Sequence, residues 1–143
     1  VTLLGMYTYQ WDRHIFLLNE RLTDNPRSLV LAHELGHASL HKELAAKGLP
    51  EYTLLPLTDK TEYEANAFAS HLLLDTREVL DLLKEGYTLS QISGELGYTE
   101  ELVKIKIAEL KKLGYELRCD FSIHSRFLAG TKEDSLGRTE NWD

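Results

Sequence analysis

The sequence is poor in cysteine, in long apolar runs and in positive charge. Its 143 residues contain one cysteine, Cys119, so no internal disulfide can form and nothing indicates a secreted, disulfide-stabilised domain. No apolar run approaches the roughly 20 residues that cross a membrane, and no signal peptide is visible. The formal net charge of −7 argues against non-specific DNA binding over the whole surface. We therefore expect a soluble intracellular protein with one ordinary core.

The most informative stretch is His33-Glu34-Leu35-Gly36-His37, an H-E-x-x-H motif. Residues four apart lie on one face of a helix, so both imidazoles can bind one metal ion. Glu34 lies one step around the helix from His33, where its carboxylate can act as a general base rather than as a ligand. A zinc hydrolase needs this arrangement. The alternative is a solvated helix that happens to carry two histidines.

Signals on both sides place the motif inside a long helix. Asn25-Pro26 supplies an N-cap followed by proline at the first helical position, which predicts where the helix begins. Lys47-Gly48, with a proline shortly beyond, predicts where it ends. Gly36 costs ~1 kcal/mol relative to alanine inside a helix. Its presence therefore predicts close packing against another backbone.

A second helix, predicted for residues 59–74, offers a third metal ligand. Catalytic zinc sites usually have three protein ligands and one open position. Glu62 lies at helical spacing from Ala65 and Ala69, so it continues the apolar face of this helix, whereas Glu64 lies off that line. Both glutamates also fit a capping box at a helix N-terminus. We expect Glu62 to be the third ligand, with Glu64 as the alternative.

Three more side chains are candidates for supporting roles around such a site. Asn66 lies one turn beyond Glu62 on the same face and can orient a ligand through a hydrogen bond. His41 lies one turn beyond His37, where it either supports the ligands or simply packs in the helix. His71 is a candidate for the rim of the active site.

The segment before the first helix is predicted to be a β-hairpin. Residues 5–18 alternate in part between apolar and polar side chains, and a turn is expected near Trp11-Asp12-Arg13. An exposed strand beside a zinc helix can receive a peptide substrate as an added strand. Alternatively, the hairpin only covers the helix.

Capping residues and glycines divide the region after the second helix into further helices. The predicted starts and ends are Asp75 to Gly86, Thr88 to Gly97 and Thr99 to Gly114. Residues 87–99 resemble a helix-turn-helix, with residues 100–113 as the would-be recognition helix.

The charges of this last helix argue against DNA binding. It carries four lysines against three glutamates, and its start, Glu100-Glu101, would face phosphates. We expect a structural or partner-docking use instead. Residues 115–129 are apolar enough to pack back on the core, partly as a strand, and residues 130–143 are predicted to be a loose tail.

Two motifs together resemble the ImmA/IrrE-type metallopeptidases. Residues 32–41 read A-H-E-L-G-H-A-S-L-H and match that family's A-H-E-L-G-H-x-x-L-H helix. Residues 62–73 read E-Y-E-A-N-A-F-A-S-H-L-L and match its E-x-E/Q-A-N-x-F-A-x-x-L-L helix. With the hairpin, the resemblance covers residues 3 to about 75. Most such proteins begin with a helix ahead of the hairpin, so we expect a further segment before Val1.

The resemblance implies an α+β fold. Its small gluzincin-like core would be a β-hairpin or short sheet packed on two zinc-binding helices, followed by a helical, helix-turn-helix-like C-terminal region. We accordingly expect a metallopeptidase core at residues 1–75, a helical subdomain at 76–114 and a C-terminal segment with a tail at 115–143.

The resemblance also implies a function. Such proteins are cytoplasmic zinc endopeptidases, often encoded by phages and mobile elements, that cleave a cognate helix-turn-helix repressor. Carried over by position, His33, His37 and Glu62 would bind Zn²⁺ and Glu34 would be the general base. The competing hypothesis is a non-catalytic regulatory module that binds protein or DNA and has a structural or vestigial zinc site.

Overall fold

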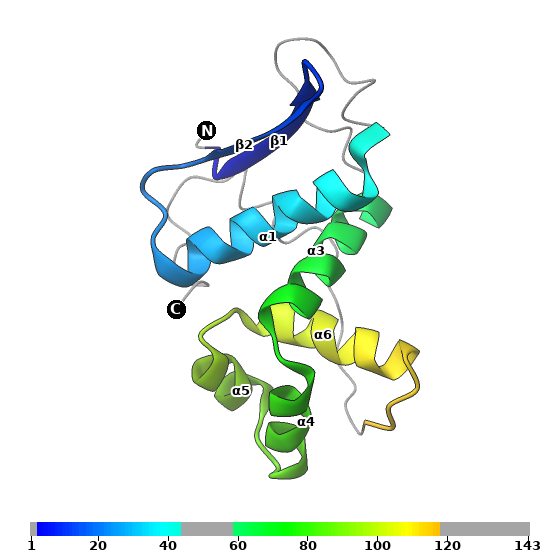
Figure 1. The fold of residues 1–143 in the computed structure, drawn as a ribbon. Helices are drawn as coiled ribbons and strands as arrows, with labels where there is room; N and C mark the ends of the chain where they lie inside the picture. Colours follow the sequence, from blue (N-terminus) through cyan, green and yellow to red (C-terminus); the bar gives the residue numbers. More distant parts are fainter. Residues whose placement is uncertain (1–2, 44–58, 118–143) are drawn as a thin grey trace.

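The computed structural model describes residues 3–43 and 59–117, which form an α+β fold in which a hairpin precedes a series of helices (Figure 1). The elements are β1 (Gly5–Gln10), β2 (Arg13–Leu18), α1 (Asp24–Leu40), α3 (Asp59–Leu73), α4 (Thr76–Lys84), α5 (Leu89–Leu96) and α6 (Glu100–Lys112). The predicted fold class is therefore confirmed. The expected strand and tail after residue 117, with Cys119, lie outside the described residues. None of the helices described is both long and apolar enough to cross a lipid bilayer.

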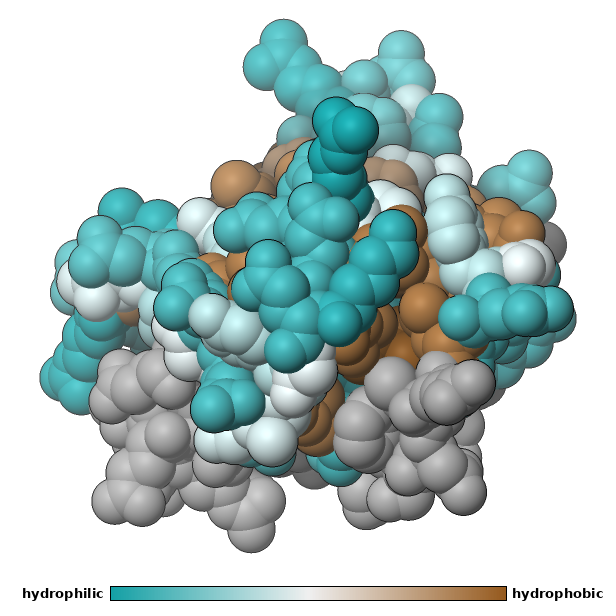
Figure 2. Space-filling model, turned by 90° about the horizontal axis from the view of Figure 1, so that it is seen from below, coloured by the Kyte–Doolittle hydropathy of each residue, from teal (hydrophilic) through white to brown (hydrophobic). Residues whose placement is uncertain are grey.

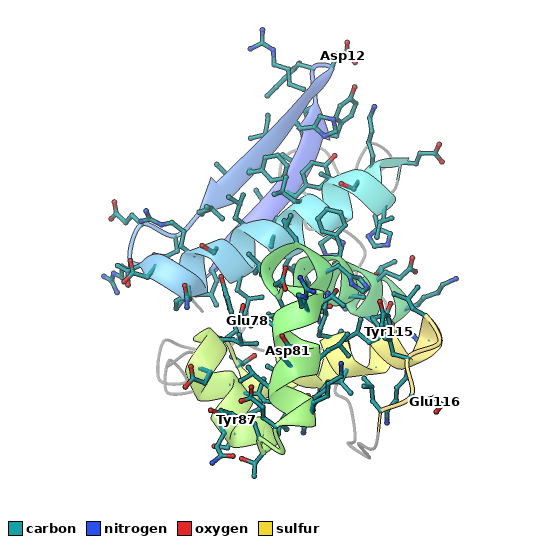
Figure 3. All side chains as sticks on the ribbon, turned by 60° about the horizontal axis from the view of Figure 1, so that its bottom comes forward. Asp12, Glu78, Asp81, Tyr87, Tyr115 and Glu116 are labelled. Atoms are coloured by element: carbon teal, nitrogen blue, oxygen red, sulfur yellow. The ribbon has the colours of Figure 1, made fainter. Side chains whose placement is uncertain are left out.

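The predicted hairpin is present and packs along α1 (Figure 1). β1 and β2 are antiparallel, with Gly5 opposite Leu18. Trp11 and Asp12 form a two-residue turn in which both residues have positive φ, 51° and 58°. Two-residue turns with this backbone match the right-handed twist of the strands they connect. Figure 3 shows Asp12 at the hairpin tip, at the end of the molecule opposite Tyr87.

The predicted start of the first helix was wrong. Thr23, not Asn25, is the N-cap residue of α1, and its side chain makes no capping hydrogen bond. The Asn25 amide instead donates to the carbonyl oxygen of Gly97, at 2.6 Å, in the turn between α5 and α6. The Asn25 side chain is therefore bonded to Gly97, which is distant in the sequence, instead of capping α1.

α1 does not continue unbroken to Lys47 as the sequence predicts, and the predicted end of the helical run lies outside the described residues. α1 ends at Leu40, because His41 leaves the helical backbone region, with φ −126° and ψ 22°. Its N–H still donates to the carbonyl oxygen of His37, at 2.7 Å, and closes the last turn. Residues 44–48, to which the prediction extended the helix, lie outside the described range.

α1 and α3 cross in close contact at Gly36, as the sequence predicts. A Cβ on Gly36 would lie 2.9 Å from the Cα and 3.0 Å from the carbonyl oxygen of Ala65. Ala65 and Ala69 are completely buried in this interface. Small residues on both helices therefore bring the two backbones together.

The helices after α3 begin and end close to the predicted capping residues. Asp75 accepts a hydrogen bond from the Glu78 backbone N–H, and Thr88 forms a capping box with Gln91. Thr99 caps α6 by accepting from the Leu102 N–H. The predicted helix-ending glycines have positive φ; they are Gly86, Gly97 and Gly114. Whether α5 and α6 act as a helix-turn-helix stays a prediction, as do the proposed domain boundaries.

One hydrophobic core connects α1 and α3 with the three helices that follow them. It contains buried side chains from α1, α3, α4, α5 and α6, among them Leu29, Val30, Ala69, Val79, Ile92, Leu102 and Ile107. α6 packs against both α3 and α5. Because α6 packs on α3, the helices α4, α5 and α6 support α3 from the side opposite the hairpin (Figure 1).

The end of the molecule seen in Figure 2 is polar over much of its surface, with hydrophobic side chains between the polar ones.

Gly36→Ala should lower the free energy of unfolding by about 1–3 kcal/mol, measured by urea denaturation. Overpacking at a close backbone contact costs this much and outweighs the gain in helix propensity, which is about 1 kcal/mol. Gly94→Ala is the matched control, since Gly94 lies in α5 and no described atom is within 4 Å of an added Cβ. This control should raise stability, and equal effects of the two substitutions would contradict the packing argument.

Candidate metal centre

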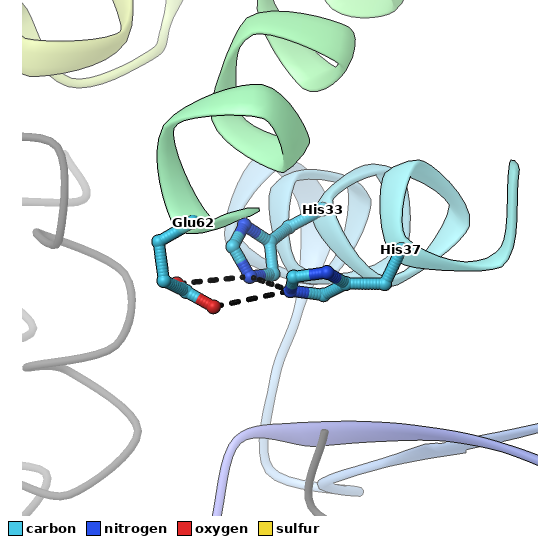
Figure 4. Close-up of side chains that lie close together, drawn as sticks. All are labelled: His33, His37 and Glu62. Atoms are coloured by element: carbon cyan, nitrogen blue, oxygen red, sulfur yellow. Dashed lines mark hydrogen bonds and ion pairs between the residues drawn. The ribbon is translucent and has the colours of Figure 1, made fainter. Parts of the chain in front are cut away.

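Two side chains of α1 and one of α3 converge in the interior of the protein (Figure 4). The Nε2 atoms of His33 and His37 are 3.1 Å apart. Glu62 places Oε1 at 3.1 Å from His37 Nε2 and Oε2 at 3.3 Å from His33 Nε2. All three side chains are completely buried. We call these three residues the metal cluster.

The helix geometry explains why these side chains meet. His33 and His37 are one turn apart on α1, so they share a face, and the glycine between them lets α3 approach. Glu62 lies in the first turns of α3, three residues before the buried Ala65 on the same face. Glu64 lies off this face and is 37% exposed. The two glutamates that the sequence offered as alternatives thus occupy different environments, and Glu62 is the one in the cluster.

The donor set fits a divalent metal ion. Two imidazole nitrogens and a carboxylate are ligands that zinc hydrolases use. A tetrahedral zinc with normal bond lengths places neighbouring ligand atoms about 3.4 Å apart. Here the two imidazole nitrogens are 3.1 Å apart, a different oxygen of Glu62 lies 3.1 or 3.3 Å from each of them, and one ligand atom from each residue can be chosen so that all three lie within 4.8 Å of one another. The cluster could therefore enclose such an ion with little movement of its side chains.

Asn66 contacts His33 at Nδ1, the ring nitrogen that does not face the other two residues of the cluster. Its Oδ1 is 2.7 Å from His33 Nδ1, and both side chains are completely buried. An amide oxygen only accepts hydrogen bonds, so His33 Nδ1 carries the hydrogen and donates it. This tautomer leaves the Nε2 lone pair directed at the cluster, as a metal ligand requires. Asn66 thus lies where the sequence placed it, one turn beyond Glu62.

His41 contacts the second histidine in a similar way. The Nδ1 atoms of His37 and His41 are 2.9 Å apart, and His41 is nearly buried. Burial lowers the pKa of His41, while the nearby Glu64 carboxylate opposes that shift. The distance between His41 Nε2 and Glu64 Oε2 is 3.8 Å. The sequence named His41 as a candidate supporting residue but did not link it to Glu64.

Glu34, the predicted general base, is a buried carboxylate. It directly follows His33 on α1 and is 1% exposed. A buried carboxylate of this kind can exchange a proton with a water molecule.

His71 lies away from the metal cluster. It is more than two turns along α3 from Glu62, roughly 13 Å along the helix axis. Its Nδ1 is 3.2 Å from Lys106 Nζ, and its Nε2 is 3.8 Å from Glu109 Oε1. Burial lowers the pKa of His71, and the charge of Lys106 lowers it further. The structure thus places His71 against α6 rather than at the candidate active site.

The polar contacts between α3 and α6 were not predicted from the sequence. Lys106 is 1% exposed, and burial lowers its pKa. The Tyr63 hydroxyl donates to Glu109 Oε2 at 2.7 Å, and Lys112 donates to the same carboxylate at 2.9 Å. The available signal was the position of Lys106 between Ile105 and Ile107. These contacts hold the turn of α3 that follows Glu62.

Comparison with known proteins places this architecture in a family. Residues 4–108 match the model of the Peptidase_M78 family, described as the IrrE N-terminal-like domain. The chain is 36% identical over 110 residues to "Uncharacterized immunity region protein 2" of Bacillus phage phi105, covering 76% of this chain and 69% of that protein. It is 30% identical over 101 residues to "Metallopeptidase ImmA" of Bacillus subtilis (strain 168), covering 69% of this chain and 58% of that protein. No solved structure gives a significant match.

The family match spans most of the chain and includes both helices that supply the metal cluster. The name of the Bacillus subtilis relative agrees with the family resemblance that the two motifs indicate. This chain therefore belongs to the Peptidase_M78 family, the metallopeptidases of the ImmA/IrrE type.

Proposed function

We propose that this protein is a zinc-dependent endopeptidase, with His33, His37 and Glu62 as the metal ligands and Glu34 as the general base. The convergence of the three buried donor atoms beside a buried glutamate carries this proposal. A member of a metallopeptidase family with this donor set is best explained as a hydrolase of peptide bonds.

The residues of the chain have distinct roles in this mechanism. Zinc, when bound, would supply a Lewis acid that polarises the scissile carbonyl and makes water more acidic. Glu34 accepts a proton from the attacking water and returns it to the departing amine nitrogen. Asn66 holds His33 in the tautomer that binds metal.

The substrate in this proposal is a protein chain, namely a helix-turn-helix repressor of a phage or mobile element, cleaved in the cytoplasm. The name of the phage relative, an immunity region protein, supports this choice. The hairpin supports an extended peptide as the bound form, because each of its strands has one partner among the described residues. A peptide can pair with the free edge of such a strand.

The alternative function is a non-catalytic regulatory module that binds a protein or DNA and keeps a structural or vestigial zinc site. A structural zinc site is usually closed by a fourth protein ligand. The cluster found within residues 3–43 and 59–117 has three donors, which favours an open, catalytic site. Of the lysines of α6, Lys106 is buried and Lys104 is paired with Glu101, which does not favour DNA binding.

Zinc should stabilise the protein, and Glu62 should be required for this effect. A ligand present at 1,000 times its Kd adds about 4 kcal/mol of stability, which raises Tm by several degrees. We expect chelator-treated protein to melt at a higher temperature after zinc is added, in a thermal-shift measurement. Glu62→Ala should lose nearly all of this increase, whereas Glu64→Ala should keep a clearly larger part of it at the same zinc concentration. The reverse order would make Glu64 the ligand.

Glu34→Gln should keep zinc but lose peptidase activity, by at least about 100-fold, because the amide cannot accept the proton. The measurement is cleavage of a repressor from the same mobile element, followed by gel electrophoresis and mass spectrometry. Glu78→Gln, at an exposed position of α4, is the control and should cleave at the wild-type rate. A zinc-loaded wild type that binds the repressor without cleaving it would favour the regulatory module.

A further inference from the structure

A row of side chains continues from the metal cluster towards the protein surface. His37 has Nε2 in the cluster and Nδ1 at 2.9 Å from His41 Nδ1. On its other side, His41 has Nε2 at 3.8 Å from Glu64 Oε2. Exposure rises along this row, from 0% for His37 to 6% for His41 and 37% for Glu64. The row therefore joins the buried cluster to a carboxylate at the edge of α3.

The contact between the two histidines determines where their hydrogens lie. Two Nδ1 atoms at 2.9 Å form a hydrogen bond only if one carries a hydrogen and the other offers a lone pair. His37 needs its Nε2 lone pair for the metal, so its Nδ1 carries the hydrogen and donates. His41 then accepts at Nδ1 and carries its own hydrogen on Nε2. His41 Nε2 lies 3.8 Å from Glu64 Oε2, which is an ion-pair distance and too long for a direct hydrogen bond.

We propose that His41 and Glu64 form a positioning relay that holds His37 in the ring orientation and tautomer that bind the metal. This inference rests on the metal site of the proposed function. Neither residue touches the metal in this arrangement, since Glu64 acts on His41 and His41 acts on His37. Glu64, considered above as a ligand, thus supports the ligand set from outside it.

The relay gives the two histidines equivalent support from one helix. Asn66 on α3 fixes His33 directly, through a hydrogen bond of 2.7 Å. In the proposed relay, Glu64 on the same helix acts on His37 through His41. Partners of metal-binding histidines commonly act in this way, by setting the tautomer and raising the basicity of the ligand.

The affinity for zinc tests this relay in the full chain, by competition with a chromophoric chelator. His41→Phe and Glu64→Ala should each weaken zinc binding by about 10–100-fold, the usual effect of losing such a partner. Glu64→Gln keeps an oxygen that faces His41 but loses the charge, so its zinc affinity should lie between those of the wild type and Glu64→Ala. The double variant should be no weaker than the weaker single variant, because both residues act through one contact.

Two control variants and a spectroscopic measurement exclude a general structural effect. His14→Phe alters a histidine on β2 that contacts Tyr7, and Glu78→Ala alters an exposed glutamate; both should bind zinc like the wild type. NMR of ¹⁵N-labelled imidazoles should place the His41 hydrogen on Nε2 in the zinc-loaded wild type. In Glu64→Ala this signal should change, while circular dichroism shows that the fold is retained.

The outcomes separate the relay from the proposed function. Wild-type affinity in both His41→Phe and Glu64→Ala, additive losses in the double variant, or a His41 hydrogen on Nδ1 would each overturn the relay. If the zinc affinities follow the expected order and no repressor is cleaved, the relay stands and the endopeptidase proposal fails. A wild type that binds no zinc would overturn both.

Discussion

The close contact between α1 and α3 at Gly36 is the constraint on which the metal centre depends. Because Gly36 has no side chain, the backbone of Ala65 lies where a Cβ would otherwise be. This approach brings the face of α1 that carries His33 and His37 within bonding distance of Glu62. The apolar core continues beside this contact, so burial of apolar side chains holds the two helices in register.

Burying the polar side chains of the cluster costs free energy unless they have hydrogen-bond or metal partners. Three alternate positions of α3, residues 62, 64 and 66, contribute to these contacts. Glu62 belongs to the cluster and contacts both histidines, and Asn66 accepts the hydrogen of His33. In the relay that we propose, Glu64 completes the set by acting on the second histidine through His41. The short pattern of glutamate, glutamate and asparagine in α3 thus has a physical reason at each position.

The helices that follow α3 belong to the same hydrophobic core, and α6 packs against α3, the helix that carries Glu62. α6 directs most of its apolar residues at that core, and its polar contacts hold Tyr63, the neighbour of Glu62. A helix used in this way has few side chains left for other partners, apart from its exposed last turn. The architecture therefore agrees with the family match, which runs from residue 4 to residue 108 and so includes α4, α5 and most of α6.

The sequence by itself determined the features that depend on neighbours along the chain. Caps, helix-ending glycines, the hairpin and the H-E-x-x-H spacing are local, and helical periodicity was enough to put Glu62 rather than Glu64 on the inner face. Contacts between distant segments could not be predicted. Asn25 fits a helix cap by local rules, yet it bonds to Gly97, and Lys106 is buried although lysines are usually solvated. The tertiary structure decided these partners, because they depend on which faces of whole elements pack together.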